Sequence, residues 1–270
     1  MYIHQKATKP FSRRQITYYR DLLWELVSRE MKLLYKRSLL GVFWTLLNPL
    51  LQLLVFSTVF RLVLKTGQSI PNYLAYAFSG LLIWGWTQTS LFQATGLITG
   101  NRPLIRQPSF PTAILPIVTV TTGMIHFLLA FPALLIIMVI DKVQIGWPIV
   151  FLPLLWVLQF IFTLSFAYPL AALNVTFRDT QHTLGVILQL MFYMLPIFYA
   201  VGDGTIPPAL AQLYHWNPLV VLLDAYRYVL IGGDRPSLIA MFGLSAVCLA
   251  ILPIGYQIFK RQGAKFVEEV

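Results

Sequence analysis

The chain has 270 residues, of which 57% are hydrophobic and 11% charged, and 20 Lys and Arg against 10 Asp and Glu give a formal net charge of +10. Soluble domains carry about 25% charged residues, so this composition excludes an ordinary soluble domain, whose surface needs more charge. A disordered chain is also excluded, because apolar content this high collapses in water. The composition predicts an all-α integral membrane protein with several spans.

The first 38 residues form a basic arm. Over residues 16 to 36, most apolar side chains fall on one half of a helical wheel and most charged ones on the other. This pattern predicts an amphipathic helix in the headgroup layer. Two interpretations of this helix stay open: it is a membrane anchor only, or it is an anchor that also lies along a cytoplasmic partner. We expect no cleavable signal peptide, since the first apolar run starts only near residue 39.

Six charge-free stretches are each long enough to cross a bilayer core, which takes about 20 apolar helical residues. They are Leu39–Phe60, Thr66–Asn101, Gln107–Ile140, Val143–Phe177, Thr180–Gly202 and Pro236–Phe259. The expected organisation is an arm at 1–38, a six-helix transmembrane domain at 39–259 and a tail at 260–270.

The apolar stretch Gly204–Leu223 is interrupted by Pro207, Pro208 and Pro218. Because proline breaks a continuous helix, we expect a re-entrant helical pair between helices 5 and 6, packed against protein. The alternative is a surface loop with a helix in the headgroups.

The distribution of basic residues predicts the orientation. With the amino terminus inside, fifteen Lys and Arg lie on the inner side and five on the outer side. This bias follows the positive-inside rule, so both termini are expected in the cytoplasm.

Several kinds of chemistry lack their sequence signals. No Gly is followed by Lys, which excludes a Walker A phosphate loop in this chain. The single cysteine, Cys248, excludes an intramolecular disulfide. His126 is the one titratable candidate inside a predicted span, either as a proton relay or as a histidine bonded to a neighbouring helix. We expect no metal, no catalytic site and no energy source of its own.

A set of short motifs follows the chain in order. They are SLLGVFW at 38–44, LNPL at 47–50, NRPLIR at 101–106, NVTFRD at 174–179, PIFY at 196–199, WNPL at 216–219 and DAYR at 224–227. In order and spacing this set resembles the membrane subunit of type-2 ABC exporters of polysaccharide, which export O-antigen, capsule or teichoic acid. The resemblance covers essentially the whole chain.

The resemblance implies partners and a location. Such permeases are homodimers in the bacterial inner or plasma membrane, bound to two copies of a separate ATPase that holds ATP and Mg. They move lipid-linked glycan outward, and neither a cofactor in this chain nor nucleic acid is involved.

The resemblance also implies functional residues. The segment between spans two and three would couple to the ATPase through Asn101, Arg102, Arg106 and Phe110. A cytoplasmic gate would comprise Arg37, Arg178 and Asp179. The outer gate would comprise Trp216, Asn217, Pro218, Asp224 and Arg227. Aromatic candidates for the substrate path are Phe43, Trp44, Trp84, Trp86, Tyr193, Phe198 and Tyr199.

Each assignment has a structural alternative. Arg102 and Arg106 also fit plain positive-inside residues, and Arg178 with Asp179 fits the end of a span. Asp224 and Arg227 lie three apart on one helical face, where they can neutralise each other. The aromatics also fit ordinary interfacial or lipid-facing packing.

Two other functions stay open. One is a type-2 permease for a drug or a lipid. The other is a membrane enzyme acting on lipid-linked sugars, for which Asp203, Asp224, Asp234 and His215 are the only outer grouping, without catalytic spacing.

Overall fold

The computed structural model describes residues 13–108, 110–201, 214 and 216–269, and most of these are helical, with no strand among them. The first half contains α1 (Arg13–Tyr35), α2 (Phe43–Ser57), a π-helical turn (Thr58–Val63), α3 (Tyr73–Thr95), α4 (Leu97–Gly100), α5 (Arg102–Ile105) and α6 (Ile114–Ile140). The second half contains a 3₁₀ turn (Trp147–Phe151), α7 (Leu152–Thr176), α8 (Thr180–Met194), α10 (Pro218–Ile231) and α11 (Leu238–Glu269). Asp203, Pro207, Pro208 and His215, which the sequence analysis singled out, lie outside the described residues.

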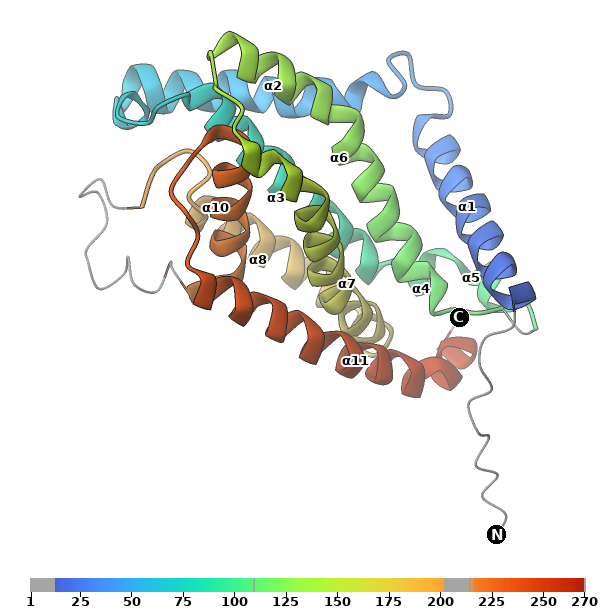
Figure 1. Cartoon of the computed structure of the whole chain (residues 1–270). Helices are drawn as coiled ribbons and strands as arrows, with labels where there is room; N and C mark the ends of the chain where they lie inside the picture. Colours follow the sequence, from blue (N-terminus) through green and yellow to red (C-terminus); the bar gives the residue numbers. More distant parts are fainter. Residues whose placement is uncertain (1–12, 109, 202–213, 215, 270) are drawn as a thin grey trace.

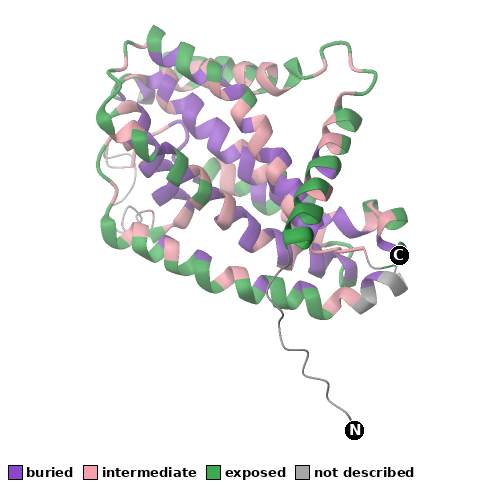
Figure 2. Cartoon of the chain, turned by 45° about the vertical axis from the view of Figure 1, so that its right-hand side comes forward, coloured by how far each residue is buried: buried purple, intermediate pink, exposed green. Residues whose placement is uncertain are grey.

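The core lies where α3 packs against α6 and α7, with α10 against α3 and α7 and with α11 along α7 (Figure 1). Buried residues follow these inner helices, whereas long stretches of α2, α8 and α11 are exposed (Figure 2). In α2 only Leu53 is buried. A helix that is apolar on all sides but little buried requires lipid or another protein surface around it.

The bundle has two distinct ends (Figure 1). The short helices α4 and α5 lie at one end, close to the start of α1 and the end of α11, and α10 lies toward the other. At that second end, the Asp141 carboxylate accepts a hydrogen bond of 2.8 Å from the backbone N–H of Ala75. Asp141 thereby pairs one of the donors that the first turn of α3 leaves unsatisfied.

Among the described residues, four helices are long and apolar enough to cross a membrane. They are Phe43–Val63, Ile114–Ile140, Trp147–Thr176 and Leu238–Gly263. Each matches a predicted span, so the all-helical, multi-span prediction is confirmed at this level. The other two predicted spans correspond to α3 and to α8, which has 15 residues.

The described chain begins and ends with a helix. Helix α1 covers nearly the whole of the segment 16–36 that was predicted to be an amphipathic helix. The expected tail at 260–270 does not begin with a break, because α11 continues through Lys260 to Glu269. The charges that end the apolar run therefore do not end the helix.

Candidate functional site

After α8 the backbone leaves the helix, and the carbonyls of this non-helical segment are bound by side chains from other helices. The guanidinium of Arg227 in α10 donates from Nη2 to the carbonyl of Pro196 at 2.7 Å and approaches that of Ile197 at 3.3 Å. Buried backbone carbonyls outside a helix require such partners. Arg227 supplies them from a helix that begins twenty-four residues after the end of α8.

Two tyrosines of α3 complete this arrangement. The hydroxyl of Tyr76 donates to the carbonyl of Tyr199 at 2.8 Å and has that of Pro196 at 3.2 Å as a second acceptor. The hydroxyl of Tyr73 donates to the carbonyl of Phe198 at 3.2 Å. We call Arg227, Tyr76 and Tyr73 the carbonyl clamp, since together they bind every carbonyl from residue 196 to 199.

Arg227 is buried, with only 4% of its surface exposed. Its charge is balanced by the ring of Tyr76, 3.4 Å from the guanidinium carbon, and by Asp224 one turn earlier, 3.9 Å away. A cation over an aromatic ring is stabilised most when it is desolvated. The sequence expectation that Asp224 and Arg227 face each other is thus met, but the bonds to carbonyls are shorter than the ion pair.

A second polar network crosses the core one layer deeper. Gln159 of α7 is fully buried; its amide donates to the carbonyl of Ile83 at 2.8 Å and to the hydroxyl of Thr87 at 3.1 Å. The hydroxyl of Tyr226 donates to the Gln159 oxygen at 2.8 Å. Helices α3, α7 and α10 are therefore joined by hydrogen bonds directly beside the clamp residue Arg227.

Helix α1 is fastened to the bundle by polar contacts as well as by packing. The hydroxyl of Thr122 in α6 donates to the Glu30 carboxylate at 3.1 Å. Burial raises the pKa of the Glu30 carboxyl above its ordinary value, while the Thr122 hydrogen bond and Arg29 oppose that rise. One turn along α6, His126 Nδ1 lies 2.9 Å from the Tyr35 hydroxyl, which also contacts Thr45.

These contacts favour the structural interpretation of His126, because the residue joins α6 to the end of α1 and to α2.

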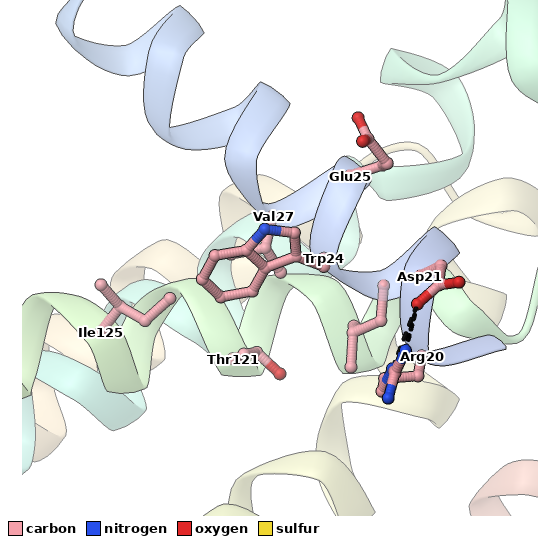
Figure 3. Close-up of a pocket in the computed structure, with 8 residues that line it drawn as sticks. Arg20, Asp21, Trp24, Glu25, Val27, Thr121 and Ile125 are labelled. Carbon is pink, nitrogen blue, oxygen red and sulfur yellow. Dashed lines mark hydrogen bonds and ion pairs between the residues drawn. The ribbon is translucent and has the colours of Figure 1, made fainter. Parts of the chain in front are cut away.

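Farther toward the start of α1, a pocket of about 470 Å³ lies between α1 and α6. Figure 3 shows Trp24 reaching across it toward Thr121 and Ile125, with the ion pair of Arg20 and Asp21 beside it.

The predicted coupling segment begins with the short helix α5, which follows α4 at one end of the bundle. Its exposed cations are Arg102 and Arg106, whereas Ile105 between them is buried and anchors the segment. The Asn101 side-chain amide donates to the Leu97 carbonyl at 3.0 Å, which fixes the turn between α4 and α5. The segment therefore presents charge outward on a backbone that is held from within.

Phe110 is half-buried and lies where this segment returns to the bundle. It lines an open groove of about 730 Å³ with residues of α1, α6, α7 and α11. Three residues after Phe110, the Ala113 carbonyl accepts a hydrogen bond of 2.9 Å from the Tyr168 hydroxyl, which fixes the start of α6.

The residues expected at a cytoplasmic gate lie in two exposed turns. Arg37 follows α1 and has a left-handed backbone with φ of 65°, which redirects the chain toward α2. Arg178 and Asp179 lie between α7 and α8, where the Asn174 side chain accepts from the N–H of Gln181 at 3.2 Å. Helix α4, which directly precedes the coupling segment, packs against α7.

The aromatic candidates divide by burial. Phe43, Trp44 and Tyr193 are exposed on α2 and α8. Trp84, Trp86 and Phe198 are buried, and Trp86 donates from its ring nitrogen to the Val120 carbonyl at 3.1 Å. The exposed and buried groups cannot face the same environment.

Tyr199 is half-buried and bonds through its hydroxyl to the Met194 carbonyl. The remaining outer-gate candidates begin α10: Trp216 is exposed, Pro218 is the first helical residue, and the Asn217 side chain caps the helix by accepting from the N–H of Leu219 at 3.0 Å.

Residues 21–231 match the family described as ABC-2 type transporter. The chain belongs to this family. It is similar to the O-antigen export system permease protein RfbA of Myxococcus xanthus, with 34% identity over 257 residues that cover 95% of this chain and 98% of the relative. A Klebsiella pneumoniae protein of the same name is 28% identical over 92% of this chain and 94% of its own length.

A more distant relative of this ABC-2 chain is the polysialic acid transport protein KpsM of Escherichia coli, 20% identical over 87% of this chain and 91% of the relative.

The clamp tyrosines Tyr73 and Tyr76 and the core Gln159 were missed by sequence reasoning. A Gln inside an apolar run at position 159 was the one available signal, since a buried amide needs partners on other helices. Tyr73 and Tyr76 carried no comparable signal, because α3 contains many aromatic residues and nothing in the sequence distinguishes these two.

Proposed function

We propose that this chain is the permease subunit of an ABC exporter that moves lipid-linked polysaccharide outward across the inner or plasma membrane. The observation that carries the proposal is the end-to-end similarity to a relative named as an O-antigen export permease. The relatives are permeases of export systems, so we place ATP and Mg on a separate ATPase subunit, present in two copies, and assign no catalytic role to this chain.

In the membrane arrangement that we propose, α3 and α8 join the four long apolar helices to make six spans, with both termini in the cytoplasm. Helix α1 of the arm then lies along the inner headgroups, and α11 continues into the tail. The positive-inside bias of the sequence supports this orientation. It puts α4 and α5 on the cytoplasmic side and α10 on the outer side.

The coupling surface that we propose consists of the exposed Arg102 and Arg106, positioned by Asn101 and Phe110. Exposed cations on an internally anchored segment suit docking to a partner protein. Arg37 and the Arg178–Asp179 turn would border the cytoplasmic opening. The non-helical segment after α8, with Trp216, Asn217, Pro218, Asp224 and Arg227, would form the outer gate as a re-entrant unit.

A homodimer would cover the exposed apolar surfaces of α2 and α8. The glycan path would then run between copies and be lined by Phe43, Trp44 and Tyr193, which are exposed on these two helices. Tyr199 would lie at its outer end. For Trp84, Trp86 and Phe198, burial within one copy supports a packing role.

The test is affinity purification of the tagged chain from its native membrane in mild detergent, with mass spectrometry of the proteins recovered. We expect an ATPase with a Walker motif in equal stoichiometry, and loss of surface polysaccharide when the chain is deleted. A folded dimer recovered alone, with turnover of lipid-linked sugar, would instead support the membrane enzyme. Intact surface polysaccharide in the deletion strain would support another cargo.

A further inference from the structure

A cavity of about 480 Å³ lies above the carbonyl clamp, at the α10 end of the bundle. Its walls come from three separate segments: residues 69–72 before α3, the face of α10 that carries Asp224 and Arg227, and residues 232–237 between α10 and α11. Pro196 and Tyr76 contribute from the clamp side. This volume is in the range of pockets that bind small organic ligands, about 300 to 1,000 Å³.

The lining combines polar groups of both signs with rigid apolar ones. Its described charged residues are Asp224, Asp234, Arg227 and Arg235, whose formal charges cancel. Neutral hydrogen-bonding groups come from Ser69, Asn72 and Ser237, and apolar surface from Pro71, Pro196 and Pro236. A balanced lining gives no preference for a charged ligand, whereas it offers donors, acceptors and C–H contacts to a neutral, hydroxyl-rich ring.

The pair Arg227 and Asp224 gives this lining a fixed donor and acceptor. Their closest N···O separation is 3.9 Å, beyond the 2.7 to 3.2 Å of a direct hydrogen bond. A hydroxyl between them can accept from the guanidinium and donate to the carboxylate, which has room for about four hydrogen bonds. The clamp already immobilises Arg227, so little conformational freedom is lost when a ligand binds there.

We propose that this cavity binds one or two neutral sugar residues of the exported glycan as the chain emerges on the outer side. The inference rests on the proposed function and adds a saccharide subsite to it. Asp224 and Arg227 bind ring hydroxyls, Asp234 and Arg235 on the α10–α11 link offer further charged contacts at the wall, and the prolines contact the C–H faces of the sugar.

The test measures protection of a cysteine at the rim. In a Cys248→Ala background, Ser237→Cys places an exposed thiol in the lining, and Gln144→Cys places a control thiol on the exposed link between α6 and the 3₁₀ turn. The permease–ATPase complex is labelled with a maleimide, with and without lipid-free polysaccharide released by mild acid from the host's own surface. Polyethylene glycol of similar size is the crowding control.

We expect the polysaccharide to slow labelling at position 237 several-fold, with no change at 144 and no effect of polyethylene glycol. Adding Asp234→Ala, on the exposed link between α10 and α11, should restore the labelling rate. Equal rates at 237 with and without polysaccharide would overturn the subsite, and so would equal slowing at both positions. Surface polysaccharide in cells that carry the same variants tests the proposed function on its own. Failure of the saccharide subsite can therefore be distinguished from failure of the proposed function.

Discussion

Arg227 and Tyr76 bind the same carbonyl from opposite helices. The guanidinium of Arg227 lies 3.4 Å from the centre of the Tyr76 ring, and both side chains have the Pro196 oxygen within hydrogen-bond distance, at 2.7 and 3.2 Å. The cation, the ring and the carbonyl thus form one unit between α10, α3 and the segment after α8. Loss of one member weakens the contacts of the other two.

Arg227→Lys should destabilise the protein more than Tyr76→Phe. Lysine cannot keep both the planar contact with the ring and the two bonds to carbonyls, and a hydrogen bond from a charged donor contributes about 1.5 to 3 kcal/mol. Tyr76→Phe keeps the ring and loses only the hydroxyl. The measurement is thermal unfolding of the detergent-purified chain followed by size-exclusion chromatography. A larger loss in Tyr76→Phe would show that the hydroxyl is the main contact of the clamp.

Gln159 and Tyr226 should be energetically coupled. Gln159→Leu leaves the Tyr226 hydroxyl without its acceptor and removes the donor to Ile83 and Thr87. Interhelical hydrogen bonds in membranes average about 0.6 kcal/mol and reach about 1.7, so we expect a coupling energy in that range from a double-mutant cycle with Tyr226→Phe. Additive effects of the two substitutions would mean that the buried hydrogen bond contributes nothing measurable.

The sequence predicted the fold better than the site, for a physical reason. Apolar runs and charges report where a chain meets lipid and water, which located the long helices and α1. They do not report where a helix ends, so the continuation of α11 beyond Lys260 was missed. Nor do they report which side of an all-apolar helix faces protein, so Trp84 and Trp44 looked equivalent although one is buried and the other exposed.

The partners of Arg227 were hidden for a different reason. Its proximity to Asp224 follows from helical spacing, but the carbonyls it binds lie thirty and thirty-one residues earlier in the chain. A backbone carbonyl that accepts a hydrogen bond cannot be identified from the sequence, because every residue has a carbonyl. A site built from backbone acceptors therefore becomes visible only when the chain is folded.

Glu30→Gln should stabilise the protein at neutral pH but not in acid. Because burial raises the pKa of Glu30, the folded state favours the protonated carboxyl. Its stabilising contribution is complete below the ordinary Glu value of about 4.3 and is lost as the pH rises through the raised pKa. Glutamine keeps an oxygen for Thr122 without a charge. The measurement is the difference in melting temperature between wild type and variant at pH 5 and pH 8.

The matched control for this pH effect is Glu25→Gln, an exposed carboxylate on the same helix. We expect its melting temperature to follow the wild type at both pH values. A Glu30→Gln difference that does not grow between pH 5 and pH 8 would contradict a desolvated carboxyl at the contact between α1 and α6.

Replacement by leucine should affect export at exposed aromatic positions and stability at buried ones. Trp44→Leu and Tyr193→Leu remove rings from the exposed faces of α2 and α8, so we expect export to fall while the melting temperature changes little. Trp86→Leu removes a buried ring and its bond to Val120, so stability should fall by about 1 to 3 kcal/mol. Measuring both surface polysaccharide and thermal unfolding on the same variants separates an effect on export from an effect on stability. Normal export in the double variant Trp44→Leu/Tyr193→Leu would remove these rings from the proposed path.

Reversal of charge on the coupling segment should uncouple the ATPase without unfolding the permease. Arg102 and Arg106 are exposed, and Ile105 holds the segment in place between them, so Arg102→Glu/Arg106→Glu should leave the melting temperature nearly unchanged. Like charges across an interface cost several kcal/mol, so we expect recovery of the ATPase in pull-downs and export in cells to fall together. Lys260→Glu, an exposed cation on α11, is the control for charge alone. If the double variant retains the ATPase and normal export, these arginines serve only the positive-inside bias, and the docking contacts lie elsewhere on the same end of the bundle.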